Sequence, residues 1–208
     1  MPRVSLLTLM VSLARGSLPQ WLQSVSAKTE TINSLLLNYG DRSIRPGQSW
    51  AGNGSVDDVY TQFYVDRFVS LNQLRQEWGV SGYLRVWFHD PRLRYNESRG
   101  GRYLNLMPTQ VEQLWRPLVY WDKLVRATGD HDKRDGFGES FIVYPDGSVS
   151  VSQQREVRLK CPMALSHLPF DVVTCTYAVS IYQFDATEVR LSWIDPHETL
   201  RNSDLAWI

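Results

Sequence analysis

The stretch that decides the fold runs from Cys161 to Cys175 and reads CPMALSHLPFDVVTC. Its two ends are the only cysteines among the 208 residues, and thirteen residues lie between them. A strand pattern leads into Cys161, and another leaves Cys175. A disulfide between the two would close a fifteen-residue loop and stabilise the fold by roughly 3 kcal/mol in the chain-entropy model. In a cytosolic protein both cysteines would instead stay reduced, so the pairing depends on the location of the chain.

The first residues favour secretion. Arg3 precedes an apolar run over residues 4–14, and small residues follow, a pattern typical of a signal peptide spanning residues 1–27. A short buried helix is the alternative. Two Asn-X-Ser sequons, at Asn53 and Asn96, agree with secretion and are candidate glycosylation sites. No later stretch approaches eighteen consecutive apolar residues, so we expect no membrane span in this chain.

Composition and motifs argue against several function classes. The 22 basic and 22 acidic residues give a formal net charge of +0, which does not predict a nucleic-acid surface. The four histidines are scattered without metal-ligand spacing. No nucleophile elbow, phosphate loop or dinucleotide fingerprint occurs, and the acidic stretch 130–136 lacks the spacing of an EF-hand. We therefore expect no enzyme, no cofactor, no metal site and no nucleic-acid partner.

Apolar periodicity predicts an N-terminal helix followed by strands. Residues 28–39 place apolar side chains at helical spacing and are followed by Gly40. Residues 40–54, rich in Gly, Ser, Arg and Pro, are expected to form a loop. From Val56 onward the pattern is strand-like. Over 149–161 the apolar residues Val149, Val151, Val157, Leu159 and Cys161 share one parity, and every residue of the other parity is polar. Such alternation indicates a strand with one buried and one solvent-facing side.

Turn signals separate further short strands. YPDG at 144–147 predicts a tight turn between residues 140–143 and the alternating strand, and residues 189–193 alternate again. Other turn signals occur at Asp90-Pro91, Gly100-Gly101, Gly136 and Asp195-Pro196. Many short strands at this spacing favour an all-β fold, a sandwich or barrel of mainly antiparallel strands.

Four motifs occur in an order that is known from one protein family. YLRVWFHDPRL at 83–93 is the first, and LWRP at 114–117 is the second. The third is DGSV at 146–149, whose glycine lies fourteen residues before Cys161, and the cysteine-bounded stretch is the fourth. Together they resemble the extracellular ligand-binding domain of the Cys-loop receptors, the pentameric ligand-gated ion channels. Three positions depart from the family pattern: Phe88, Leu118 and Val173.

The resemblance implies an immunoglobulin-like antiparallel β-sandwich of about nine strands with an N-terminal α-helix. It implies that residues 28–208 form one extracellular domain and that Cys161 and Cys175 form a disulfide. LAWI at 205–208 is similar to the family's ninth strand. We therefore expect a chain that stops before the last hairpin and carries no transmembrane domain.

In this family a small ligand is held between two subunits by aromatic side chains, whose faces attract a cationic group. By position, the resemblance implies principal-side contacts from Tyr120 and Tyr182 and complementary-side contacts from Tyr83, Arg85, Ser152 and Gln154. Arg85 offers a fork that suits a carboxylate. In the family an Arg at this position belongs to receptors for amino-acid transmitters, so the resemblance implies an amine or amino-acid-like ligand; an interfacial salt bridge is the alternative for Arg85. Ser180 stands where several amino-acid receptors place an acidic partner for the ligand amine. For the two principal tyrosines, the alternative is packing at the edge of the core.

The same resemblance gives the segment of Pro169, Phe170 and Asp171 a coupling role, facing a pore domain at the membrane-facing end. A plain structural turn is the alternative. The implied function is that of a neurotransmitter-type ligand-binding domain, on the extracellular side of the cell membrane, in a homo- or heteropentamer of family subunits. The chain would meet the membrane only through a pore domain. Two alternatives remain open: a soluble secreted protein resembling the acetylcholine-binding proteins, and a structural subunit that binds no agonist.

Overall fold

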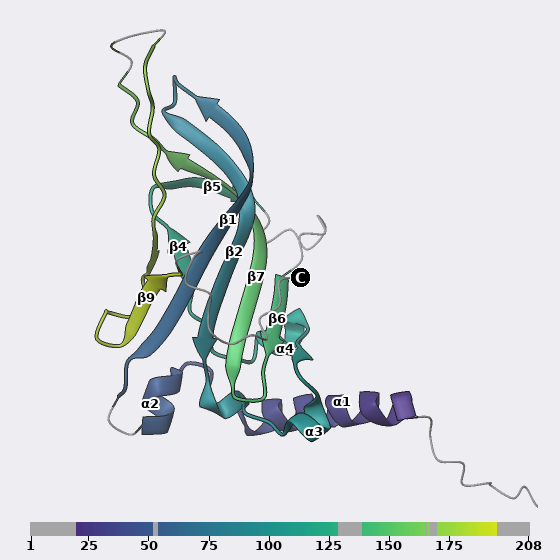
Figure 1. Cartoon of the computed structure of the whole chain (residues 1–208). Coiled ribbons are helices and arrows are strands. Elements are labelled where there is room, and N and C mark those ends of the chain that lie inside the picture. The colour runs from purple at the N-terminus through teal and green to yellow at the C-terminus, as the bar shows by residue number, and fades with distance from the viewer. Residues whose placement is uncertain (1–19, 52–53, 129–138, 165, 167–169, 195–208) are drawn as a thin grey trace, which may run out of the picture.

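The computed structural model describes residues 20–51, 54–128, 139–164, 166 and 170–194, and Figure 1 shows their arrangement. The helical segments in this part of the chain are α1 (Gln20–Asn38), α2 (Pro46–Ala51), the 3-10 turn η1 (Pro91–Leu93), α3 (Glu97–Gly100) and α4 (Pro108–Val111). Its strands are β1 (Asp57–Asn72), β2 (Glu77–His89), β3 (Leu104–Asn105), β4 (Val119–Trp121), β5 (Leu124–Thr128), β6 (Glu139–Val143), β7 (Ser148–Lys160), β8 (Val179–Ile181) and β9 (Val189–Trp193). Strands predominate, which confirms the prediction of an all-β sandwich with an N-terminal helix.

Most strands belong to one large sheet in the order β3-β6-β7-β2-β1-β9, with β5 also pairing with β7. β2 and β7 are antiparallel over their whole length, from the pair Glu77–Lys160 to the pair His89–Ser148. β9 instead runs parallel to β1, which differs from the expected antiparallel pairing. The reason is that β8, the strand before β9, lies in the second layer. The chain crosses between layers before β9 and can then enter the large sheet in the direction of β1.

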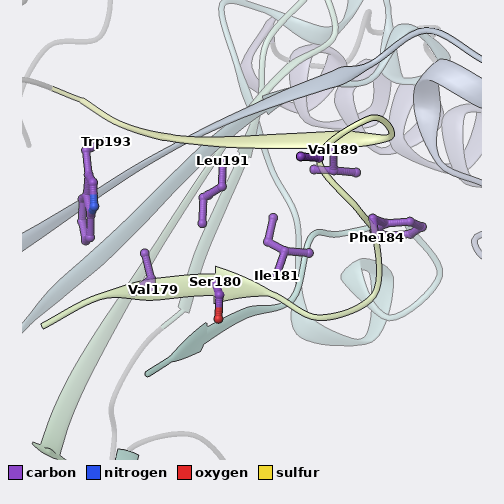
Figure 2. A pocket seen from close by; sticks show the side chains of 8 residues that line it. Val179, Ser180, Ile181, Phe184, Val189, Leu191 and Trp193 are labelled. Carbon is purple, nitrogen blue, oxygen red and sulfur yellow. The ribbon is translucent and has the colours of Figure 1, made fainter. Parts of the chain in front are cut away.

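The second layer is the two-stranded antiparallel sheet of β4 and β8, which packs on β1 and β2 through aromatic rings. The Phe63 ring centroid lies 4.6 Å from that of Trp121 and 5.6 Å from that of Tyr177. Tyr177 also stacks on Trp78 of β2, at 6.4 Å. The core between and around the layers includes Val59, Leu84, Val86, Phe88, Phe141, Val149, Val151 and Val157. Figure 2 shows the end of the second layer, where β8 lies across from β9.

The strands with the clearest sequence patterns are confirmed. The alternating stretch forms β7, in which Val149, Val151 and Val157 are buried, and residues 140–143 lie within β6. The YPDG turn joins them. The Tyr144 N–H donates to the Ser148 carbonyl at 2.9 Å and closes the hairpin. Residues 189–193 form β9, as predicted.

Two predicted boundaries are wrong. The N-terminal helix begins at Gln20 rather than at residue 28. The expected loop over 40–54 contains the helix α2, which begins at Pro46. Proline suits a first helical position because its missing N–H would have no partner there and its fixed φ matches the helix. The Gly-, Ser- and Pro-rich composition hid this helix start.

Several sequence-based predictions fall outside the described residues. They concern the start of the expected signal peptide at 1–19, the sequon at Asn53, the acidic stretch 130–136 with Gly136, Pro169, and the turn and strand expected over 195–208.

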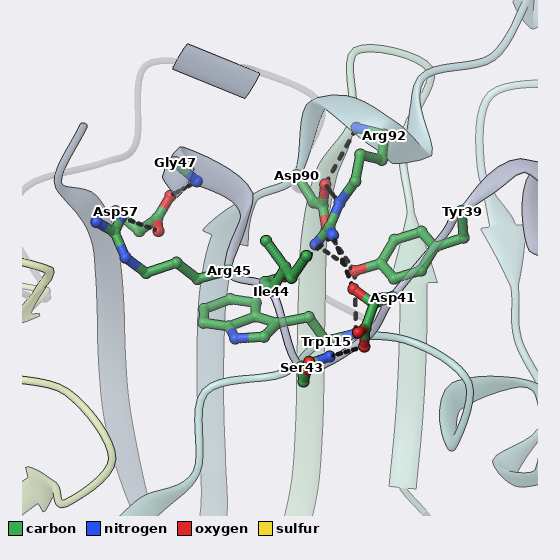
Figure 3. Close-up of polar contacts among 10 residues, drawn as sticks. All are labelled: Tyr39, Asp41, Ser43, Ile44, Arg45, Gly47, Asp57, Asp90, Arg92 and Trp115. Carbon is green, nitrogen blue, oxygen red and sulfur yellow. Dashed lines mark hydrogen bonds and ion pairs between the residues drawn. The ribbon is translucent and has the colours of Figure 1, made fainter. Parts of the chain in front are cut away.

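Tyr39, directly after α1, joins this helix to the large sheet through a buried hydrogen-bond network (Figure 3). Its hydroxyl donates to Asp90 Oδ2 at 2.6 Å. It accepts from Arg92 Nη2 at 2.7 Å and from the Trp115 backbone N–H at 2.9 Å. Burial, followed by the Asp90 carboxylate, raises the pKa of Tyr39 well above its usual value. The network thereby fixes the backbone of Trp115, shortly before β4 begins.

A second polar cluster in Figure 3 fastens α2 to the start of β1. Arg45 Nη1 lies 2.9 Å from Asp57 Oδ2, and both side chains are almost fully buried. The Gly47 N–H donates to the other carboxylate oxygen at 2.8 Å. Burial raises the pKa of Asp57, while the hydrogen bonds from Arg45 and Gly47 oppose the shift. The partners thus favour an ionised carboxylate against the cost of burying it.

Cys161 and Cys175 form a disulfide with a Cα–Cα distance of 5.3 Å, so the implied pairing is confirmed. In Figure 1 this segment and the β1–β2 turn lie at the end of the sandwich away from α1. Apolar side chains surround a shallow hollow there: Phe68, Leu71, Trp78, Val173 and Cys175. Phe170 is 87% exposed at the same loop.

Candidate ligand-binding site

The two tyrosines predicted for the principal side lie together on the two-stranded sheet. Tyr120 of β4 lies opposite Ser180 of β8, and Tyr182 directly follows β8. The ring centroids of Tyr120 and Tyr182 are 5.1 Å apart, with an interplanar angle of 74°. This is the edge-to-face geometry that aromatic pairs prefer. Tyr120 is 41% exposed and Tyr182 78%, so both rings remain open to a ligand.

Alternation along the two strands explains why these tyrosines face outward. Trp121 is buried against the large sheet, so its neighbour Tyr120 points the other way. In β8, Figure 2 shows Val179 and Ile181 on the side that faces β9 and the Ser180 hydroxyl on the opposite side. The outward face of the second layer therefore carries the even-numbered residues, and its inner face carries apolar ones.

Asp122, which the sequence reasoning did not single out, belongs to this outward face. It directly follows β4, and its backbone N–H donates to the Ala178 carbonyl at 2.9 Å. Its Oδ1 accepts a hydrogen bond from Ser180 Oγ at 2.8 Å. The signal in the sequence that could have pointed to Asp122 is its spacing of two residues from Tyr120, which places both side chains on the same face of a strand. The pairing of β4 with β8, which puts it beside Ser180, is not visible in the sequence.

The residues predicted for the complementary side also lie together, on β2 and β7. Tyr83 lies opposite Gln154, and Arg85 opposite Ser152. All four are half-buried. On its other side Arg85 lies opposite Gln62 of β1, and its Nη1 donates to Gln62 Oε1 at 3.5 Å. The register thus gathers a guanidinium, a phenol, a hydroxyl and two amides into one patch.

The two sets of residues lie on opposite surfaces of the sandwich. Phe63 and Leu84 are paired across β1 and β2 and point into the core, toward β4 and β8. Tyr83 has the opposite parity to Leu84, so it faces away from the second layer together with its complementary-side partners. The Tyr120 face points outward on the other side. One copy therefore cannot bring both sets to one small ligand.

The model of the neurotransmitter-gated ion-channel ligand binding domain matches residues 28–206. The chain belongs to this family. It is 27% identical over 169 residues to the glycine receptor subunit beta of Homo sapiens, which covers 81% of this chain and 33% of that protein. It is 26% identical over 170 residues to the human gamma-aminobutyric acid receptor subunit rho-2, with coverage of 82% and 35%.

A third relative in this family is an acetylcholine-gated chloride channel subunit of Caenorhabditis elegans. The identity is 22% over 199 residues, which covers 95% of this chain and 41% of that protein. The chain thus spans about a third of the length of the first two relatives and somewhat more of the third. These relatives are receptor and channel subunits, and none of them is named as an enzyme.

The remaining predicted residues of this ligand-binding domain lie apart from both faces. Asn96 is exposed and caps α3, where its Oδ1 accepts from the Ser98 N–H at 2.9 Å. Phe170 and the half-buried Asp171 lie at the disulfide-bonded loop. Their roles, like those of the ligand-site residues, remain predictions.

A cavity of about 300 Å³ lies between β8 and β9 and was not predicted from the sequence. Apart from Ser180, the residues that line it have apolar side chains, among them Val179, Ile181, Phe184, Leu191 and Trp193 (Figure 2). It opens on the inner side of β8, away from the tyrosine pair. Its lining includes no charged side chain among the described residues, so we assign no ligand to it.

In the described part of this domain, no three or more His, Cys, Asp and Glu side chains gather as a metal ion would require. None of its helices combines the length and apolar character needed to cross a bilayer.

Proposed function

We propose that this chain is the extracellular ligand-binding domain of a pentameric ligand-gated channel subunit, and that it binds a small amine or amino-acid-like ligand between subunits. Its principal face would be Tyr120 and Tyr182, and its complementary face Tyr83, Arg85, Ser152 and Gln154. The observation that carries the proposal is the placement of these two faces on opposite surfaces of one sandwich. Each copy offers one half of a site to each neighbour. Copies of this chain can therefore complete the site, and other family subunits can take the same place.

The side chains indicate the class of ligand. Two exposed tyrosine rings suit an ammonium group, since the negative face of an aromatic ring attracts cations. Arg85 suits a carboxylate, because its planar fork can donate two parallel hydrogen bonds. A ligand with both groups is an amino acid. The names of two relatives agree, since one is a glycine receptor subunit and the other a gamma-aminobutyric acid receptor subunit.

Gating would follow from differential binding. A ligand that contacts two subunits favours the arrangement in which both faces fit it, and shifts the population of the pentamer toward that arrangement. The disulfide-bonded loop lies at the end of the sandwich away from α1, with Phe170 and Val172 almost fully exposed. These side chains suit contact with a pore domain. A soluble secreted binder would have no use for such an exposed apolar tip, so we favour the channel subunit.

The proposed function places the domain outside the cell. The disulfide supports an oxidising, extracellular environment, because such bonds are rare in the cytosol. The signal peptide would lie within residues 1–27, and the exposed Asn96 would be glycosylated.

The test is calorimetric titration of the purified chain with glycine, γ-aminobutyrate and acetylcholine, with sedimentation velocity at the same concentrations to report assembly. We expect at least one probe to bind. Tyr182→Ala and Arg85→Gln should each weaken that binding about tenfold or more, since a desolvated cation–π contact or a charged hydrogen bond contributes about 2 kcal/mol.

Two matched variants control for nonspecific effects. Tyr103→Ala removes a tyrosine that is 43% exposed, close to the value for Tyr120, but lies outside both faces. Arg158→Gln removes a charge from the outward side of β7, beyond Gln154. Both should bind like the wild type. Equal binding by Tyr182→Ala and Tyr103→Ala would remove Tyr182 from the site, and no binding of any probe by an assembled oligomer would overturn the proposed function.

A further inference from the structure

The outward face of the β4–β8 sheet combines two aromatic rings with one carboxylate. Its even-numbered side chains include Tyr120 and Asp122 on one strand and Ser180 and Tyr182 on the other. Rings and carboxylates are the two kinds of group that stabilise an ammonium ion at a protein surface. Ser180, at the position where an acid was expected, has no charge of its own. The nearest acid on this face is its hydrogen-bond partner.

Two hydrogen bonds hold this carboxylate in place. The backbone of Asp122 is tied to β8 by the bond from its N–H to the Ala178 carbonyl, at 2.9 Å. The side chain is tied by the bond from Ser180 Oγ to Oδ1, at 2.8 Å. Because Ser180 lies directly opposite Tyr120 in the ladder, this second bond draws the carboxylate toward the tyrosine pair.

The carboxylate remains able to bind a ligand. The side chain of Asp122 is exposed, so its second oxygen is accessible to an ammonium group. Among the described residues, no Lys, Arg or His nitrogen lies within ion-pair distance of it. Ser180 satisfies one oxygen and orients the group, and the cationic end of a ligand can take the other.

We propose that Asp122 is the counter-ion for the ligand's ammonium group, and that Ser180 positions it. This rests on the proposed function and deepens it. The acid of the site is carried by the residue after β4, and the residue on β8 supplies only a hydroxyl. With Arg85 of the neighbouring copy on the carboxylate, the site then selects a ligand that has both charges.

The experiment moves the carboxylate between the two strands. Four proteins are titrated with γ-aminobutyrate, glycine and acetylcholine: the wild type, Asp122→Asn, Ser180→Ala, and the double variant Asp122→Asn/Ser180→Asp. Asp122→Asn keeps the size of the side chain and removes its charge, so we expect affinity to fall about 10- to 100-fold, as for loss of a charged hydrogen bond. For Ser180→Ala the affinity should fall only about threefold, because the carboxylate loses the hydrogen bond that orients it but keeps its charge. The double variant should recover most of the loss, because the carboxylate returns to the same face from the opposite strand.

Each outcome decides between the two proposals. If a probe binds the wild type and Asp122→Asn equally, Asp122 is not the counter-ion, while the proposed function stands. A loss in Asp122→Asn without recovery in the double variant assigns Asp122 a role in holding β4 to β8, and overturns its contact with the ligand. If no probe binds the wild type, the proposed function fails and this inference fails with it. Thermal unfolding of every variant, with Tm expected within about 2 °C of the wild type because Asp122 is exposed and Ser180 only half-buried, shows that the fold is intact.

Discussion

Replacing Tyr39 by phenylalanine tests the network that joins α1 to the segment before the ligand site. The change removes one oxygen atom and leaves the ring, so packing is retained. It removes the acceptor of the Trp115 N–H, which lies 2.9 Å from the hydroxyl, and the bond to Asp90 Oδ2 at 2.6 Å. Asp90 keeps its two hydrogen bonds from Arg92. Arg92 Nε donates to Asp90 Oδ1 at 2.9 Å, and Arg92 Nη2 donates to Asp90 Oδ2 at 2.8 Å. The main cost is therefore the buried N–H of Trp115.

A buried donor without a partner costs about 1–3 kcal/mol, and the lost bond to a charged acceptor adds to it. We expect Tyr39→Phe to lower the free energy of unfolding by about 2–3 kcal/mol. For a domain of this size, each kcal/mol lowers Tm by about 2–4 °C, so the expected drop is about 4–12 °C. The assay is thermal unfolding followed by near-ultraviolet circular dichroism, with the disulfide intact.

Tyr103→Phe is the matched control. It deletes the same hydroxyl from a tyrosine that is 43% exposed, where water replaces any lost bond, so Tm should stay within about 2 °C. Equal Tm values for the two variants would refute the reasoning, since they would mean that the Tyr39 hydroxyl contributes no more than a surface hydroxyl does.

Three further predictions concern the disulfide, alkaline pH and glycosylation. Replacing Cys161 and Cys175 together by serine should lower the free energy of unfolding by roughly 3 kcal/mol; a thiol assay on the denatured, unreduced wild type should find no free thiol, and two would contradict the pairing. The pKa of Tyr39 is raised in the folded state, so its contribution is complete below the unfolded pKa of about 10 and is lost as the pH rises above it. The stability difference between the wild type and Tyr39→Phe should thus be constant from pH 7 to 9 and shrink above pH 10, and a growing difference would contradict the assignment. Asn96→Gln in the chain secreted from eukaryotic cells should lose one endoglycosidase-sensitive mass step, while an unchanged mass would show that Asn96 carries no glycan.

The parts of the fold that could be predicted are those in which short-range pattern and tertiary environment agree. β7 alternates because one side is packed in the core, and the YPDG turn has the glycine that its φ of +88° at Gly147 requires. α2 was missed because its composition resembles a loop. The parallel pairing of β9 was missed because strand direction depends on the layer from which the chain arrives.

The candidate site likewise contains residues that could be predicted from the sequence and residues that could not. Tyr120, Tyr182 and Arg85 could be predicted as site residues because they lie at fixed distances from recognisable motifs. Asp122 was missed because its place beside Ser180 depends on the pairing of β4 with β8, two strands that are far apart in the sequence. Tyr39 was predicted only as part of an apolar helix face. Its buried hydrogen bonds come from segments that only the folded chain brings together.

Cross-linking between copies tests the central claim most directly, because the two faces of one copy lie on opposite surfaces. Cells would express a Tyr182→Cys form together with a Ser152→Cys form, and a short bismaleimide would join free thiols across the interface. We predict a covalent dimer of the two forms. Bound γ-aminobutyrate should lower the yield of this dimer. The pair of Tyr182→Cys with Tyr103→Cys should give none. Absence of the first product, or equal yields from both pairs, would contradict a ligand site formed between the Tyr182 face of one copy and the Ser152 face of the next.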